Sequence, residues 1–325
     1  MPFTCFHTVH DAVPRSTPIT YGYDASRRTM DLVRTWTGRQ FIHSGNWWNI
    51  TPEKRTKEIV LEAQVKKINK HVVGLMSMNV QPGNEPMYWI NDDSTGEHMQ
   101  ECLANAIHAR DELENQGINA PLYCALQPST KTMAEIWFQK AIDNDFQHLC
   151  VGVSEFLRSP KYRKEGIGRI FEFVITAHNV LGDTGKLHLS GLMSYAMLPV
   201  VARLGVTSTD GSTPVQSALA YGSVFTPGTG RGTRASQLIE KNRDAGWKCD
   251  CMVCNGLDLE SVQDAMQDRS SRVQHNIHAW TDLVDEINHA ILPNPSRWFH
   301  EHEESISKTM RRYWMRATSL LDSST

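Results

Sequence analysis

Three of the chain's seven cysteines fall within six positions, as Cys249, Cys251 and Cys254 in the stretch WKCDCMVCNG. Thiolates at this spacing are typical ligands of a tetrahedral zinc ion, which needs one more donor. Downstream, residues 271–291 carry apolar side chains at helical spacing, with His275 and His278 near the start of the predicted helix. We assign His275 as the fourth ligand. Because four protein ligands leave no open coordination position, the sequence predicts one structural zinc ion per chain.

The composition is that of a globular protein, with 40% hydrophobic and 21% charged residues in a chain of 325. No stretch is apolar enough for an export signal or a membrane span, so we expect a cytoplasmic protein with no membrane partner. Reduced cysteines in that compartment hold metal more often than they form disulfides. The net charge of −3 does not indicate a nucleic-acid binder by itself, but basic residues gather in three short runs, 159–169, 226–234 and 308–316.

Short strand-like runs alternate with longer helical patterns along most of the chain. The predicted strands are 40–45, 71–80, 120–127, 148–154, 186–192 and 205–210. The predicted helices are 51–70, 96–117, 129–145, 169–182 and 192–205. We expect Thr51 to cap the first helix, with Pro52 in its first turn, and Gly117 to end the second. Pro199 predicts a kink or a late start in the last.

This alternation is typical of a parallel sheet covered by helices, either open and doubly wound or closed as a (β/α)8 barrel. Residues suited to binding or chemistry end six predicted strands, namely His43, Asn79, Gln127, Gly152, Gly191 and Asp210. A barrel brings all its strand ends to one mouth, whereas an open sheet gathers mainly those near its switch point. We therefore predict an α/β fold with a TIM-type barrel over 1–246 that bears the active site. A zinc-binding subdomain over 247–291 and a helical segment over 292–325, packed on the barrel, would follow.

Several stretches, in the same order, resemble the tRNA-guanine transglycosylase superfamily. FIHSGNW (41–47) lies where that family has a strand followed by Asp-Ser-Gly-Gly-Phe, and TPEKR (51–55) resembles its Ser-Pro-Glu-Arg helix start. LYCALQPS (122–129) and HLCVGVSEF (148–156) resemble its base-binding strands. HLSGLMSYAMLPVVARLGVTSTD (188–210) resembles the segment that ends on its nucleophilic aspartate. The resemblance runs from residue 40 to residue 290, and the cysteine motif and Asp210 are its most specific parts.

The resemblance implies a base exchange in nucleic acid. The carboxylate of Asp210 would attack C1′ of a target guanosine, expel guanine and hold the sugar as a covalent ester. A free 7-deazaguanine base would then attack the same carbon, as in the two-step chemistry of retaining glycosidases. Besides Asp210, the implied substrate contacts are Ser44, Asn79, Gln127, Gly152 and Gly191.

Departures from the family pattern change the expected base recognition. The family's first aspartate, which handles protons on the exchanging base, is replaced by His43, a residue that can exchange protons near neutral pH. Asp92 and Asp93 are nearby carboxylates that could substitute. Where the family has an aspartate after its second strand, this chain has Met78 and Asn79. An amide cannot supply the two acceptors of a carboxylate.

The segment after Asp210 lacks the Leu-Pro-Thr-Arg and Gly-Arg features of the tRNA enzymes, and we expect Arg231 and Arg234 to contact the polymer backbone instead. This pattern is similar to the branch that inserts 7-deazaguanines into DNA in phages and bacterial modification systems. The sequence therefore predicts a pentosyltransferase acting on DNA, in the host cytoplasm if phage-encoded. Because the target base must leave the stack, Trp47, Trp48 and Tyr221 are candidates for stacking.

Two alternatives stay open at the level of sequence. One is a tRNA-guanine transglycosylase with altered base specificity, and the other is a non-catalytic paralogue that serves as a nucleic-acid-binding subunit. The loss of family aspartates at His43 and Asn79 favours the second, whereas Asp210 argues against it. A homodimer or a helicase-like partner that opens the duplex is compatible with either enzyme.

Overall fold

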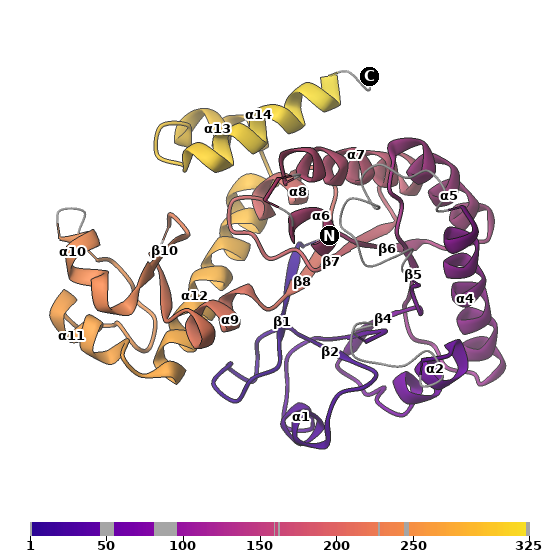
Figure 1. Ribbon diagram of the computed structural model, residues 1–325, viewed down its shortest axis with the longest axis horizontal. Helices are drawn as coiled ribbons and strands as arrows, with labels where there is room; N and C mark the ends of the chain where they lie inside the picture. The colour runs from indigo at the N-terminus through magenta and orange to yellow at the C-terminus, as the bar shows by residue number, and fades with distance from the viewer. Residues whose placement is uncertain are drawn as a thin grey trace.

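A closed barrel of eight parallel strands forms the centre of the protein, as the sequence predicts, with helices around it (Figure 1). The computed structural model describes residues 2–45, 55–80, 96–158, 160–161, 163–226, 228–243 and 247–322. Strand β8 closes the barrel on β1, with Phe6 opposite Asp210. The barrel strands are β1 (Thr4–Thr8), β2 (Ile19–Gly22), β3 (Gln40–His43), β4 (Val72–Met76), β5 (Leu122–Leu126), β6 (His148–Gly152), β7 (Lys186–Ser190) and β8 (Ser208–Gly211).

Strands β1 and β2 are absent from the prediction, and their composition explains why. β1 reads TCFHT and β2 reads ITYG, so neither contains a run of aliphatic residues long enough to indicate a strand. Both are nevertheless buried, since closure of the barrel covers them on two faces. The other six barrel strands lie within the ranges predicted, apart from Gly211, which extends β8 by one residue.

The five predicted helices all form around the barrel, with differences in the bounds of two of them, and three further short helices among the described residues around it were not predicted. Helix α2 is capped by Thr56 and ends at Val65 rather than at residue 70; the expected cap, Thr51, lies outside the described residues. Helix α7 begins at Arg163, six residues before the predicted start at 169. Helix α8 starts late, with Pro199 in its first turn, as the sequence predicts. The surrounding helices are α1 (Arg27–Val33), α2 (Lys57–Val65), α4 (Gly96–Asn115), α5 (Lys131–Asp143), α6 (Ser154–Arg158), α7 (Arg163–Leu181), α8 (Leu198–Arg203) and α9 (Thr213–Ala220).

Strand alternation sorts the barrel interior into layers. One buried cluster joins side chains from five strands around the barrel, namely Phe6, Phe41, Met76, Tyr123, Ala125 and Cys150. Because side chains point to the same face at every second residue, the next inward positions lie at the C-terminal mouth. Two residues after the cluster, four of these strands carry Thr8, His43, Gln127 and Gly152. All four line a cavity at the mouth. The apolar layer therefore forms the floor beneath a polar mouth.

A second, smaller core lies beside the barrel. The antiparallel pair β9 (Ser223–Thr226) and β10 (Arg231–Arg234) is followed by α10 (Leu238–Asn242), α11 (Leu259–Ala265) and α12 (Arg269–Glu286). Val224, Leu238, Val262 and Met266 form this core together with two of the clustered cysteines. In Figure 1 the segment projects to the left, beyond α9 and α12.

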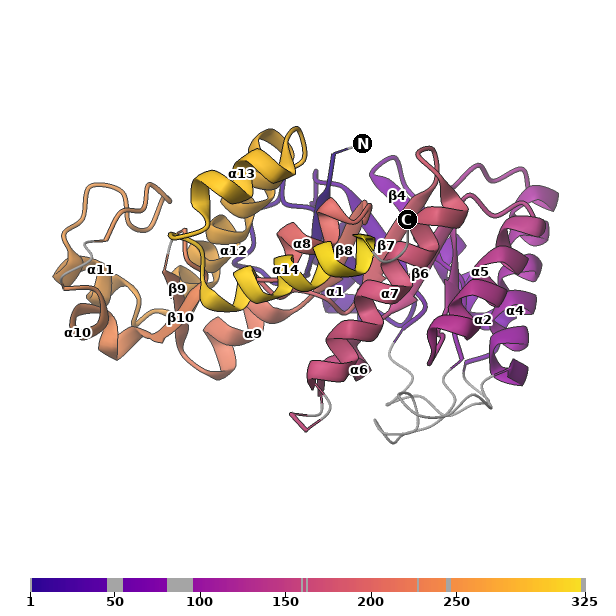
Figure 2. The ribbon, with the colours of Figure 1, turned by 90° about the horizontal axis from the view of Figure 1, so that it is seen from above.

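The C-terminal helices pack on the outside of the barrel. After a π-helical turn over Ile287–Ile291, α13 (Pro295–His302) leads into α14 (Lys308–Asp322), which runs along α7 and α8 (Figure 2). Trp314 of α14 is buried, and Arg203 of α8 donates a 2.9 Å hydrogen bond to Thr318. Within the described part of the chain, no helix combines the length and apolarity that crossing a membrane requires.

Candidate functional site

A cavity of about 740 Å³ opens at the C-terminal mouth of the barrel. Its volume falls within the range of roughly 300–1,000 Å³ that small-molecule sites occupy. Ser44 does not line it and is fully buried, but donates a hydrogen bond to Asn79. Arg231 lines an adjoining cavity, and Arg234 lines neither. The cavity brings together six residues predicted from strand ends, namely His43, Asn79, Gln127, Gly152, Gly191 and Asp210.

Asp210 lies one residue before the end of β8, and its carboxylate is only 4% exposed. The backbone N–H of Gly191 donates to its Oδ1 at 2.6 Å, and Thr20 Oγ1 donates to its Oδ2 at 3.3 Å. Gly191 has φ +83°, a conformation that glycine adopts without the strain of a side chain, and this conformation aims the N–H at Asp210. The carboxylate is thus fixed in orientation at the cavity wall.

His188 is a second buried group beside Asp210, and the sequence analysis missed it. It is 0% exposed, lies on the inward face of β7, and stacks on Phe41 with ring centroids 4.2 Å apart. Its Nδ1 is hydrogen-bonded to Ser208 at 2.9 Å, while its Nε2 lies 3.7 Å from Oδ2 of Asp210. The sequence could have indicated this residue, because it is a histidine between two leucines in the predicted strand KLHLSGL.

The pKa of Asp210 is lowered by its neighbours. Burial alone would raise this pKa, but the imidazoles of His188 and His43 and the N–H of Gly191 together outweigh burial. A lowered pKa means that the carboxylate is ionised at neutral pH. An ionised, oriented carboxylate next to a cavity is the arrangement that a nucleophile requires.

His43 faces the same cavity in its neutral form. Burial lowers its pKa, and the attraction of Asp210 and Asp24 does not fully compensate. Its Nδ1 accepts a 3.0 Å hydrogen bond from the backbone N–H of Gly45, so a ring proton is carried by Nε2. His43 can therefore donate a hydrogen bond to a ligand without carrying a permanent charge.

Asp24 is a further carboxylate at the cavity, also missed because β2 was not predicted. It is exposed and follows β2 by two residues. A Cβ built on Gly22 would lie 2.1 Å from Oδ1 of Asp24 and 3.0 Å from Cε1 of His43, so both groups approach the same point. Asp92 and Asp93, expected as alternative carboxylates, lie outside the described residues, as do Trp47 and Trp48. Tyr221 is 72% exposed and does not line the cavity.

Arg55 joins the ends of β3 and β4 beneath the cavity. It is buried, and its guanidinium donates to the carbonyl oxygens of Ser44 and Asn79 and to the side-chain Oδ1 of Asn79 at 2.9 Å. Ser44 also donates to this Oδ1, at 2.8 Å. Since the Asn79 oxygen is occupied by two donors, its amide N–H groups remain to face a ligand. Asn79 thus offers donors where the family pattern has an acceptor.

Replacing Arg55 by glutamine should lower the free energy of unfolding by about 2–4 kcal/mol, because several buried acceptors lose their donor. Thermal and denaturant unfolding measure this loss. The matched control is Arg34→Gln, which removes an exposed arginine paired only with Asp31 at the surface and should change stability by less than about 1 kcal/mol. Equal stability of the two variants would contradict the structural role of Arg55.

The amide of Gln127 occupies space that a side chain at residue 152 would otherwise fill. A Cβ built on Gly152 would lie 2.5 Å from Nε2 of Gln127, so the glycine leaves the space that the amide occupies. Gln127 is 4% exposed and lines the cavity. Gln127 and Asn79 together give the cavity two amide groups for recognition of a polar ligand.

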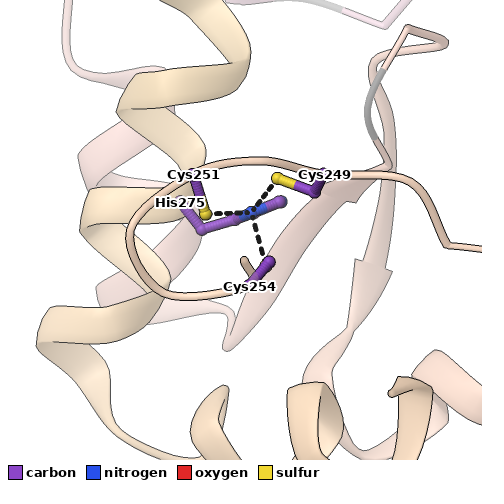
Figure 3. A group of neighbouring side chains, drawn as sticks. All are labelled: Cys249, Cys251, Cys254 and His275. Atoms are coloured by element: carbon purple, nitrogen blue, oxygen red, sulfur yellow. Dashed lines mark hydrogen bonds between the residues drawn. The ribbon is translucent and has the colours of Figure 1, made fainter. Parts of the chain in front are cut away.

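The four predicted metal ligands form one cluster in the small core. Each Sγ of Cys249, Cys251 and Cys254 lies 3.5 Å from Nδ1 of His275 (Figure 3). The Nε2–H of His275 donates to the carbonyl oxygen of Phe225 at 2.8 Å, which leaves Nδ1 free to bind a metal ion. These residues can hold a structural metal ion.

The helix that carries His275 is held by its neighbour Asn276, whose bonding role the sequence analysis missed. Asn276 accepts from the N–H of Phe225 at 3.1 Å and donates to the carbonyl oxygens of Pro214 and Ser223. His278, the other histidine near the helix start, lies outside the cluster and instead contacts Asp250 at 2.9 Å. The hydrogen bonds from His275 and Asn276 to β9 therefore place His275, and not His278, beside the cysteines.

No family model and no curated protein matches this sequence.

Proposed function

We propose that the protein is a base-exchanging pentosyltransferase that replaces guanine in DNA with a 7-deazaguanine. The observation that carries the proposal is Asp210, an ionised carboxylate fixed at the wall of a cavity large enough for a nucleoside. Glycosyl transfer with a covalent intermediate needs such a nucleophile below the anomeric carbon. The order of motifs that resemble guanine transglycosylases supports guanine as the departing base.

In the first step an oxygen of Asp210 forms a bond to C1′ as the bond from C1′ to N9 of guanine breaks. Oδ1 is held by Gly191 at 2.6 Å, whereas Oδ2 has the longer contacts, 3.3 Å to Thr20 and 3.7 Å to His188, so we assign Oδ2 as the nucleophile. The electron pair of the broken bond leaves with guanine, which takes up a proton. In the second step the incoming base loses its N–H proton, attacks C1′ and frees the carboxylate.

The proton transfers fall to groups at the cavity that can gain or lose a proton. Neutral His43 can donate a hydrogen bond from Nε2–H to the base, since its ring lies at the cavity and its Nδ1 is occupied by the N–H of Gly45. Asp24 lies near the same point as His43, and we assign its carboxyl group to give a proton to the departing guanine in the first step and to take one from the incoming base in the second. The amides of Asn79 and Gln127 are the groups that we assign to base recognition.

We also propose that the metal ion is zinc and that it stabilises the fold. Three thiolates and an imidazole are a typical zinc ligand set, and zinc bonds of about 2.3 Å to sulfur and 2.0 Å to nitrogen place S and N about 3.5 Å apart in a tetrahedron. The observed distances to His275 fit this value. The four ligands leave no coordination position for substrate.

Base exchange followed by mass spectrometry tests the proposal. The protein would be incubated with isotope-labelled 7-cyano-7-deazaguanine and duplex DNA, single-stranded DNA or tRNA, and the polymer then digested to nucleosides. We expect label in DNA and none in tRNA. Label in tRNA alone would contradict the choice of DNA. A zinc-loaded protein that binds nucleic acid but transfers no label would indicate the non-catalytic subunit instead.

A further inference from the structure

A second cavity of about 690 Å³ adjoins the mouth of the barrel. Ser154, Gly191, Met193 and Thr213 line both cavities, so the two share a wall. The second cavity is shallow and runs from the start of α7 past the β9–β10 hairpin to the start of α14. We call it the strand groove and define it by Arg163, Tyr195, Phe225, Arg231, Trp280 and Thr309.

The charged residues described in the strand groove are both basic. Arg163 and Arg231 enter it from two different elements, and both are exposed. No aspartate or glutamate is among the described residues that line it. In a chain with a net charge of −3, this distribution favours an anionic ligand. Several serine and threonine hydroxyls along the groove, including Ser194 and Thr309, add the small polar donors that phosphate oxygens accept.

A buried donor in the wall of the groove has no acceptor. Trp280 is 0% exposed, and its indole N–H finds no hydrogen-bond partner in the described part of the chain. The ring is fixed by edge contacts with Tyr195 and Phe225, at centroid distances of 5.3 and 4.5 Å. A buried N–H without an acceptor is unfavourable, and an indole can only donate. A ligand oxygen in the groove would supply the missing acceptor.

We propose that the strand groove binds the DNA strand next to the target nucleotide. This inference rests on the proposed function, because a polymer whose base enters the barrel must leave the cavity along a path that accommodates its phosphates. Arg163 and Arg231 contact backbone phosphates, and the indole N–H of Trp280 donates to an oxygen of the flanking nucleotide. The wall that the two cavities share places this path next to the cavity that Asp210 lines.

Binding of a fluorescent single-stranded DNA of about 12 nucleotides tests the groove by anisotropy, over a series of salt concentrations. The variant carrying Arg163→Gln and Arg231→Gln should bind at least about tenfold more weakly. The slope of log Kd against log salt should fall by about 1.4, since each phosphate contact on a single strand contributes about 0.7. Trp280→Phe, which keeps an aromatic ring but loses the N–H, should weaken binding about two- to tenfold.

Arg34→Gln is the control, because Arg34 is an exposed arginine that lines neither cavity. It should leave both Kd and the salt slope at the wild-type values. A double variant with an unchanged slope, or an Arg34→Gln variant with the larger loss, would overturn the proposal. Tighter binding of RNA of the same sequence would overturn the assignment to DNA. Melting curves verify that each variant is folded. If Trp280→Phe does not fold, the arginine variants still decide the test.

Two further outcomes separate the groove from the chemistry. If wild-type protein binds DNA through the groove but transfers no base, the proposed function fails and the groove stands. If base exchange proceeds and the double variant matches the wild type in both Kd and KM for DNA, the groove fails and the proposed function stands.

Discussion

Replacing Asp210 by asparagine should reduce base exchange by at least about 10⁴-fold, because the amide cannot form the covalent bond to C1′. Asparagine has the same shape, and its side-chain oxygen can still accept the hydrogen bond that Gly191 donates to Oδ1. We therefore expect the barrel to fold and the variant to bind DNA. Mass spectrometry of denatured reactions should show a DNA–protein adduct in the wild type and none in Asp210→Asn.

Asp24→Asn is the matched control for this substitution, since it removes the other described carboxylate in the cavity. If Asp24 handles protons, exchange should fall by about 10²-fold while the covalent adduct still forms. An adduct in Asp210→Asn that survives denaturation would show that another residue is the nucleophile.

The pH dependence of exchange follows from the two lowered pKa values. Asp210, normally near 3.8, titrates below its ordinary range, so its carboxylate is present at neutral pH and is lost only as acid protonates it. His43, normally near 6.5, also protonates at lower pH than usual and stays neutral at pH 7. Both lowered pKa values keep the ionised carboxylate of Asp210 and the neutral ring of His43 present to lower pH. Activity should therefore persist below the ordinary histidine range, which a pH–rate profile of wild type against His43→Gln measures.

Replacing Cys251 by serine should remove the proposed zinc ion and lower the melting temperature by about 10 °C or more. Cys251 and Cys254 are buried in the small core, so loss of the metal ion also removes the link between the cysteine loop and α12. Binding of zinc supplies on the order of 10 kcal/mol to the folding of such sites, which exceeds what a small core gains by packing alone. Elemental analysis and thermal unfolding measure the two effects.

His278→Ala is the control for the metal site, because His278 lies one helical turn from His275 but contacts Asp250 and Asp282 instead. It should retain about one zinc ion per chain and melt close to the wild type. Full stability of a zinc-free Cys251→Ser protein would contradict a structural role. A stable, zinc-free variant that has lost only its chemistry would indicate a catalytic metal ion.

The sequence by itself was enough to predict the alternation of strands and helices, the closed barrel and the four residues of the metal cluster. These features depend on local pattern: apolar runs of strand length, helical periodicity, and thiols at ligand spacing. The same patterns placed His43, Asn79, Gln127, Gly152, Gly191 and Asp210 at strand ends, and the barrel brings all six to one cavity. Their chemical roles stay predictions.

Only the tertiary structure revealed β1 and β2 and, with them, Thr20 and Asp24 at the cavity. Strands this short and polar are buried by closure of the barrel, which no local window of sequence contains. Likewise, His188 is paired with Asp210 by the register of β7 against β8, and Arg55 reaches Asn79 across 24 residues of sequence. A carboxylate becomes a fixed, ionised group through its three-dimensional neighbours, and these come from strands that are distant along the chain.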